Sequence, residues 1–200
     1  MLAEHLRHHD GVITLAQATS YGLSESAVDR RVRSGQWRRL SPGVYFVDDR
    51  EFTSAARVRA SVWGYGDSAT ASGTAAAWWH GLLTEPPDIV EVTVGRSATG
   101  RSRHGVRLRR RDLSTADVVS LRGLRVTALA LTVIEAAARR DGGAKVLDRA
   151  LQRHIELPPL WRAHVRNKGR YGSPRARLLL QGAEDNTHSR AERRLVQLMR

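Results

Sequence analysis

The spacing of apolar and polar positions near the start of the chain predicts three short helices. They are expected over residues 1–9, 15–21 and 25–34. Ser24 precedes the third helix as an N-cap, and glycines at 22 and 35 follow the second and third helices, where helices commonly end. Because only residues 22–24 join the second helix to the third, the pair has the spacing of a helix-turn-helix motif.

The next segment alternates apolar and polar residues and predicts a β-hairpin. Its strands are expected at 37–40 and 44–47, and Pro42-Gly43 suits the central positions of a type II turn between them. Three helices followed by a hairpin make a winged helix-turn-helix, whose recognition helix lies in the major groove of DNA. The sequence therefore predicts a DNA-binding domain over residues 1–50.

The predicted third helix has an apolar side, with Ala27, Val28 and Val32, and a polar side that is free to contact DNA. The candidate DNA-binding residues of this domain are Ser24, Ser26, Arg30, Arg31, Arg33, Arg38 and Arg39. Among them, we expect Ser26, Arg30 and Arg33 at base edges and the remaining arginines at phosphates or the minor groove. A solvated helix surface would carry the same arginines, and Asp29 on this side repels phosphate, so that alternative stays open.

Residues 51–165 combine helical and strand patterns, as expected for a small mixed α/β domain. Helices are predicted over 55–63, 72–79, 128–139 and 144–155, and strands over 89–94, 106–109 and 124–126. A winged helix, a mixed α/β domain and C-terminal helices place the whole chain in the α+β class.

An arginine-rich segment, residues 96–111, contains seven arginines and no acidic residue. Val106 and Leu108 alternate there with Arg107 and Arg109, which predicts a strand that forms a hairpin with residues 89–94 and turns both arginines outward. Two interpretations are open: Arg107 and Arg109 form a second phosphate contact, or they are solvated charges that protect an edge strand from aggregation.

The final part of the chain, residues 166–200, is expected to be a helical tail. Pro158-Pro159 and the segment 169–174 delimit predicted helices at 160–167 and 175–181. A polar linker over 184–189 is expected to follow them, and a new amphipathic helix is expected to begin at Ser189.

The net charge of the 200-residue chain is +13, from 33 basic and 20 acidic residues, which suggests a polyanionic partner. All but two of the basic residues are arginine, which fits a GC-rich genome as well as a function. The first fifty residues carry seven basic and six acidic side chains, so the excess lies in 96–111 and in 160–200. Sequence reading by the first domain must therefore rest on its motifs and not on its charge.

The chain contains no cysteine, which excludes disulfides and thiolate metal sites, and no metal or cofactor is expected. No apolar stretch approaches the roughly 20 residues of a membrane-spanning helix, and the N-terminus lacks the features of a signal peptide. We therefore expect a cytoplasmic protein that does not contact membranes. No spacing typical of a catalytic motif is present, so an enzyme is not expected.

Several N-terminal motifs resemble the winged-helix domain of AbiEi-type antitoxins, which belong to type IV toxin–antitoxin systems. They are Gly11-Val-Ile-Thr14-Leu-Ala-Gln-Ala18, Gly22-Leu-Ser24, the Arg-Arg-Val-Arg-Ser-Gly run ending at Gly35, Trp37-Arg-Arg-Leu40 and Pro42-Gly43-Val44-Tyr45. The segments 72–82 and 123–135 are similar to the second domain of that group, although Leu131 and Glu135 stand where its pattern has Arg and Asp. The resemblance implies a DNA-binding repressor of its own operon, with a nucleotidyltransferase-like toxin as a second partner.

The segment Ser189-Arg-Ala-Glu192 resembles the first helix of a restriction-endonuclease-like domain, related to very-short-patch-repair nucleases, that actinobacterial relatives carry. Hydrolysis by such domains needs clustered carboxylates that hold metal ions, and no acidic residue follows Glu192. The resemblance thus implies a truncated domain without nuclease activity.

The function best supported by the sequence is that of a DNA-binding, antitoxin-like transcriptional regulator. Two alternatives remain: a nuclease-derived protein, and a toxin-binding module that does not contact DNA.

Overall fold

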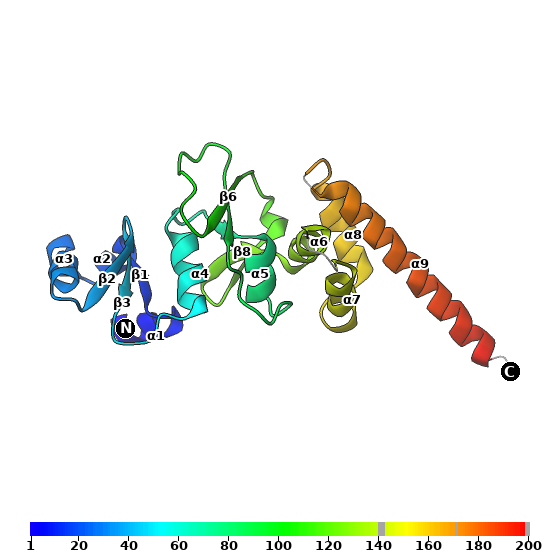
Figure 1. The fold of residues 1–200 in the computed structure, drawn as a ribbon, viewed down its shortest axis with the longest axis horizontal. Helices are drawn as coiled ribbons and strands as arrows, with labels where there is room; N and C mark the ends of the chain where they lie inside the picture. The colour runs from blue at the N-terminus through cyan, green and yellow to red at the C-terminus, as the bar shows by residue number, and fades with distance from the viewer. Residues whose placement is uncertain (140–142, 171, 199–200) are drawn as a thin grey trace.

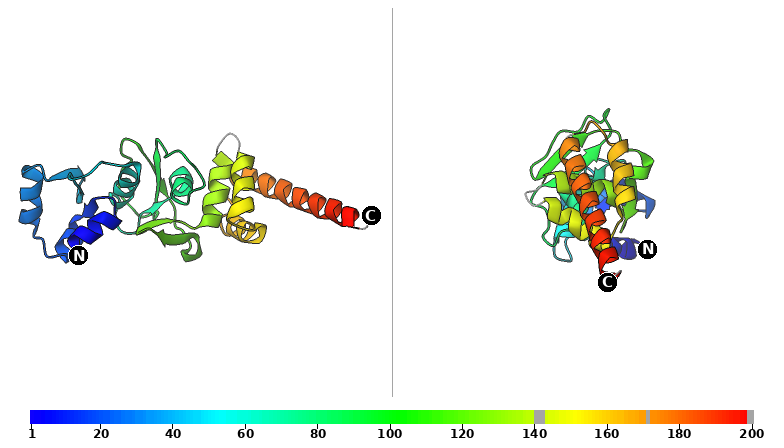
Figure 2. Two further views of the ribbon diagram at one scale, coloured as in Figure 1. Left: turned by 90° about the horizontal axis from the view of Figure 1, so that it is seen from below. Right: turned by 90° about the vertical axis from the view of Figure 1, so that its right-hand side faces the viewer.

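The computed structural model describes residues 1–139, 143–170 and 172–198, with side chains as far as residue 186. The molecule is elongated, with a three-stranded sheet and its helices near one end, a five-stranded sheet in the middle and a group of helices at the other end (Figures 1 and 2). The expected α+β class is confirmed. In the described part of the chain, no helix has the length and apolar character needed to cross a membrane.

The N-terminal unit has the topology of a winged helix-turn-helix. Its elements are α1 (Leu2–His8), β1 (Val12–Thr14), α2 (Leu15–Ser20), α3 (Glu25–Arg33), β2 (Trp37–Ser41) and β3 (Val44–Val47). The strands form an antiparallel sheet in the order β1-β3-β2. The three helices and the wing lie where the sequence predicts them, whereas β1 was not predicted because a three-residue strand is too short to show alternation.

Local signals in the sequence fix the ends of these helices. Thr14 and Gln17 form a capping box at the start of α2, and Ser24 Oγ accepts a hydrogen bond of 3.2 Å from the Ala27 amide at the start of α3. In the wing, Gly43 has a φ of 72°, which the third residue of a type II turn requires and which glycine adopts without strain. The short turn before α3 and the wing therefore follow directly from residue type.

The two faces of the N-terminal sheet are covered by different elements. Ile13 and Tyr45 pack on one face with residues from α1, α2 and α3. Val12 and Phe46 on the other face pack against Ala56 of the following helix, α4 (Ser54–Trp63). The winged helix thus shares a core with the part of the chain that follows it.

The central unit is built on a five-stranded sheet. Its other elements are β4 (Thr70–Ala71), α5 (Gly73–Trp79), β5 (Val90–Val94), β6 (Val106–Arg110), the 3₁₀ turn η1 (Thr115–Asp117), β7 (Val118–Leu121) and β8 (Leu124–Thr127). The strand order is β6-β5-β4-β8-β7, and both α4 and α5 contact β5. Strands β4 and β7 were not predicted from the sequence.

Strand β6 pairs with β5, as expected, but the pair is parallel and not a hairpin. Two consecutive parallel strands must be joined by a segment that returns to the same end of the sheet. Here residues 95–105 form this crossover and lead from the end of β5 back to the beginning of β6. Arg110 holds the backbone of this crossover by donating to the Ala98 carbonyl at 3.1 Å and to the Gly100 carbonyl. The prediction of a hairpin was therefore wrong.

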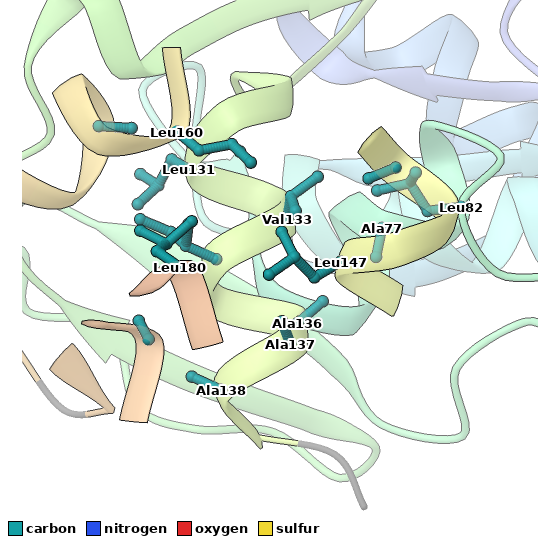
Figure 3. Close-up of a cluster of buried hydrophobic side chains, with 14 of the residues drawn as sticks. Ala77, Leu82, Leu131, Val133, Ala136, Ala137, Ala138, Leu147, Leu160 and Leu180 are labelled. Carbon is teal, nitrogen blue, oxygen red and sulfur yellow. The ribbon is translucent and has the colours of Figure 1, made fainter. Parts of the chain in front are cut away.

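The C-terminal part is a group of helices packed around α6 (Leu129–Arg139). The others are α7 (Gly143–Arg153), α8 (Leu157–Arg166) and α9 (Ser173–Leu198). Figure 3 shows Leu131 beside Leu160 and Leu180, and Val133 beside Leu147, so α6 contributes to contacts with all three neighbouring helices. The division of the chain at residues 50 and 165 stays a prediction, and residue 165 lies inside the last turn of α8.

Two expectations for the C-terminal helices were wrong. Pro158 and Pro159 lie in the first turn of α8 and do not precede it. Proline is tolerated there because a backbone amide in the first turn has no acceptor within the helix, so its absence removes no hydrogen bond. The polar linker expected over 184–189 is part of the continuous helix α9. Its acidic residues Glu184 and Asp185 are exposed and Ala183 is buried, so the described part of the polar run lies on the solvated side of a helix.

The side chains of Ser189 and Glu192, on which the resemblance to an endonuclease-like domain rests, lie outside the residues whose side chains the structure describes. This resemblance stays a prediction.

Candidate nucleic-acid interface

Helix α3 presents a polar surface at the end of the molecule farthest from α9 (Figure 1). Val28 is fully buried in the N-terminal core and fixes the rotation of the helix, so that Ser26, Arg30 and Arg33 are exposed. Among the described residues, neither Arg30 nor Arg33 forms an ion pair. Their guanidinium groups can therefore reach the edges of bases in a major groove, where arginine binds guanine in bidentate fashion.

Ser24 and Arg31 are engaged within the N-terminal unit. The Ser24 hydroxyl caps α3 and lies 3.0 Å from the Ser26 hydroxyl. Arg31 is half-buried, donates to the Ala27 carbonyl at 3.2 Å and lies over the ring of Trp37, with 5.7 Å between its guanidinium carbon and the ring centroid. These contacts position α3 against β2, so both residues support the exposed surface of the helix.

The two arginines of the wing lie on opposite faces of the sheet. Arg38 is opposite Phe46 in the register and stacks on the rings of Phe46 and Phe52, and its guanidinium lies 3.3 Å from the Asp48 carboxylate. Arg39 is opposite Tyr45, on the face that the N-terminal helices cover, and is exposed. Arg39 is thus the wing arginine on the same side of the sheet as α3.

Arg107 and Arg109 of β6 are directed toward Glu91, which the prediction of an outward orientation did not anticipate. The Arg109 guanidinium is 2.6 Å from Glu91 Oε1, and the Arg107 guanidinium is 3.7 Å from it. The side chain of Arg109 is only 20% exposed, whereas that of Arg107 is 57% exposed. The outward orientation is wrong for Arg109 because a buried carboxylate on the neighbouring strand attracts its guanidinium.

Glu91 is the centre of a buried ionic cluster in the central unit. Its carboxylate also accepts a hydrogen bond of 2.7 Å from the Thr74 amide and one of 2.8 Å from Arg139. Burial alone would raise the pKa of Glu91, but the Thr74 amide and the nearby arginines outweigh it and lower the pKa below its ordinary value. Gly73 makes room for this carboxylate, since a Cβ there would lie 1.8 Å from Glu91 Oε2. The cluster ties β5, β6, α5 and α6 together.

The crossover between β5 and β6 lies beside the wing, an arrangement that the sequence did not reveal. The Arg103 guanidinium and the Ser41 hydroxyl of the wing turn both lie within 3.0 Å of the position that a Cβ would take at Gly64. Tyr65 holds this part of the crossover: its ring lies 4.8 Å from the Arg103 guanidinium carbon, and its hydroxyl donates to the Arg101 carbonyl at 3.0 Å. Arg101 and Arg103 are both exposed. The nearly neutral winged helix therefore has a basic loop of the central unit next to its wing.

The described residues contain no group of three His, Asp or Glu side chains arranged to hold a metal ion. Within that part of the chain, the charged groups at the interface are predominantly guanidinium groups. Such a surface suits hydrogen bonding to phosphate oxygens and to base edges.

The chain is similar to proteins of known families over most of its length. The family model described as a transcriptional regulator, AbiEi antitoxin, matches residues 1–47. The family model described as the AbiEi antitoxin C-terminal domain matches residues 69–182.

One solved structure with a similar fold is the crystal structure of the RV2827C protein from Mycobacterium tuberculosis. It is 18% identical to this chain, with a TM-score of 0.56, and the alignment covers 90% of this chain and 75% of that one. No curated protein is a significant match. The two family models together cover the winged helix and most of the remaining chain, and the second model alone matches more than half of the sequence. The chain therefore belongs to the AbiEi antitoxin family.

Proposed function

We propose that this protein binds double-stranded DNA sequence-specifically through α3 and the wing, and represses its own operon as an antitoxin-like regulator. The observation that carries the proposal is the exposure of Arg30 and Arg33 on α3, without ion-pair partners in the described chain, together with Arg39 on the same side of the wing. In a winged helix-turn-helix this side is the one that meets the major groove.

The roles of the basic residues follow from their positions. Ser26, Arg30 and Arg33 reach base edges and determine sequence preference, while Arg39 holds a phosphate. Arg101 and Arg103 add phosphate contacts beside the wing, and they supply an attraction for DNA that the nearly neutral N-terminal unit lacks. Arg38 and Arg109 are paired with carboxylates and contribute less.

A nuclease footprint on the DNA upstream of the gene for this protein tests the proposal. We expect one protected site for the natural protein, loss of that site for Arg30→Ala, and an unchanged site for Arg153→Ala, which removes an exposed arginine from α7. If the duplex is fully bound by the protein but no site on it is protected from the nuclease, the protein does not bind a specific sequence.

A second role is supported by the match of residues 69–182 to an antitoxin domain. We propose that this part of the chain binds a nucleotidyltransferase-like toxin. Co-expression with the product of the adjacent gene, followed by size-exclusion chromatography, tests this role. A stable complex is the expected result, and separate elution of the two proteins would contradict it.

A further inference from the structure

A pocket of about 420 Å³ lies at the junction between the winged helix and the central unit. Asp10, just after α1, forms one side of it, and Arg122 and Gly123, in the turn between β7 and β8, form another. Arg59 of α4 also lines it. The volume is within the range of pockets that bind small molecules, and the lining residues come from segments far apart in the sequence.

The pocket contains a buried cation with unused hydrogen-bonding capacity. The Arg59 side chain is 1% exposed and lies between the rings of Trp63 and Trp79, with its guanidinium carbon 5.2 Å from each ring centroid. Its Nε and Nη2 donate to Asp10 Oδ2, and Nη2 also donates to the Arg122 carbonyl. Arg59 Nη1 is buried and has no hydrogen-bond partner among the described residues. A buried donor without a partner is costly unless a ligand or water satisfies it.

A second guanidinium adds to the positive charge of the pocket. Arg122 stacks on Trp79, with 4.4 Å between its guanidinium carbon and the ring centroid, and donates to the Trp79 carbonyl at 2.5 Å. Asp10 is the one carboxylate among the lining residues and is already paired with Arg59. The side chains of the pocket therefore carry two arginine charges against one carboxylate, without counting the two histidines, His8 and His9, at its edge.

Gly123 lies beside the buried donor and the His9 imidazole. A Cβ at this residue would lie 3.6 Å from Arg59 Nη1 and 2.5 Å from His9 Nε2, so a side chain there would clash with the His9 ring. Gly123 has a φ of 70° and Arg122 a φ of 50°, as the two central residues of a tight hairpin turn require. The turn thus brings the Arg122 guanidinium to the pocket and leaves room there for the His9 imidazole.

We propose that this pocket binds a small organic anion through a carboxylate or phosphate group held by Arg59 and Arg122. The oxygen atoms of the anion accept hydrogen bonds from Arg59 Nη1 and from the Arg122 guanidinium. Their negative charge balances the arginine charge that Asp10 leaves uncompensated. Because the lining residues belong to both units, the bound anion links the winged helix to the central unit. This site does not depend on DNA binding.

Titration of the full-length protein with inorganic phosphate and with benzoate, at constant ionic strength, tests the proposal. Tryptophan fluorescence is a suitable signal because Trp63 and Trp79 enclose Arg59. We expect a saturable change with at least one of these two anions. Saturation by phosphate alone identifies the phosphate class, and saturation by benzoate alone identifies the carboxylate class.

Two variants localise the response. Arg122→Asn removes the exposed guanidinium at a residue type that tolerates positive φ, and it should raise the dissociation constant about tenfold or more, as expected for loss of a charge-assisted hydrogen bond. Arg125→Asn, at an exposed position on β8, should leave the dissociation constant unchanged. A response that sodium chloride reproduces, no saturation with either anion, or equal affinity in Arg122→Asn would overturn the proposal.

Discussion

Arg59 donates two hydrogen bonds, of 3.0 and 2.9 Å, to the same carboxylate oxygen of Asp10. Asp10 follows the first helix of the winged helix-turn-helix, and Arg59 lies on α4, which packs against both sheets. Burial lowers the pKa of Arg59 and its pairing with Asp10 opposes that effect, and the guanidinium remains a cation near neutral pH. The ion pair therefore connects the winged helix-turn-helix unit to α4.

Replacing Asp10 with Asn should destabilise the protein markedly. The substitution keeps the shape of the side chain and tolerates the φ of 56° at this position, but it leaves the buried Arg59 without a counter-charge. Because the Asp10 side chain is 30% exposed, we expect a loss of about 2 to 3 kcal/mol in the free energy of unfolding, below the loss for a fully buried pair.

Urea denaturation measures this loss, with Asp48→Asn as the control. Asp48 pairs with Arg38 at the surface, where both side chains are more than 40% exposed, so the control should lose less than about 1 kcal/mol. If Asp10→Asn and Asp48→Asn lose equal amounts of unfolding free energy, the charge of the Asp10 carboxylate does not stabilise the buried Arg59.

Replacing Glu91 with Gln should also destabilise the protein. The variant keeps an acceptor for the Thr74 amide but removes the charge that balances Arg109 and Arg139, whose side chains are 20% and 11% exposed. We expect the free energy of unfolding to fall by about 3 kcal/mol or more. A loss below about 1 kcal/mol in urea denaturation would contradict a central role for this carboxylate.

The contribution of Glu91 to stability should depend on pH in one direction. Its pKa is lower in the folded protein than in the unfolded chain, so its contribution is fully present above the unfolded value of about 4.3 and is lost as pH falls through the folded value. The difference in unfolding free energy between the natural protein and Glu91→Gln should therefore be constant near neutral pH and narrow below about pH 4. Denaturation series at several pH values measure this difference. A difference in unfolding free energy that grows as the pH falls would contradict a lowered pKa for Glu91 in the folded protein.

The two wing arginines should behave differently toward DNA. Arg39→Ala should weaken binding to all duplexes by a similar factor and reduce the slope of log K against log salt by about one. Arg38→Ala should change the slope less, because Arg38 is paired with Asp48 and stacked on two phenylalanine rings. Fluorescence anisotropy over a range of salt concentrations gives both slopes. A larger change in slope for Arg38→Ala than for Arg39→Ala would mean that DNA contacts the other face of the wing.

The winged helix could be predicted from the sequence because its signals are local. Thr14 and Ser24 cap helices within three residues of their own positions, and Gly43 supplies the positive φ of the wing turn. The polar surface of α3 follows from helical periodicity once Val28 is placed in the core. For this surface, the candidate residues and their exposure could be inferred without tertiary structure.

The arrangement of the central unit depends on contacts between distant residues, and the sequence did not reveal it. Arg109 turns inward because Glu91, eighteen positions away, is buried on the adjacent strand. A single carboxylate inside the apolar run of residues 89–94 was the available signal that a cation must lie nearby. Arg103 reaches the wing only because β5 and β6 are parallel, which sends residues 95–105 back along the sheet.

The specificity of the natural protein for DNA tests the central claim most directly. Its affinity for the duplex upstream of its own gene should be compared with its affinity for a scrambled duplex of the same length and composition, at physiological salt. Reading of bases by α3 predicts that the natural duplex binds at least about 10³-fold more tightly and that Arg30→Ala reduces this ratio. Equal affinity for the two duplexes would contradict the claim that this protein reads DNA sequence.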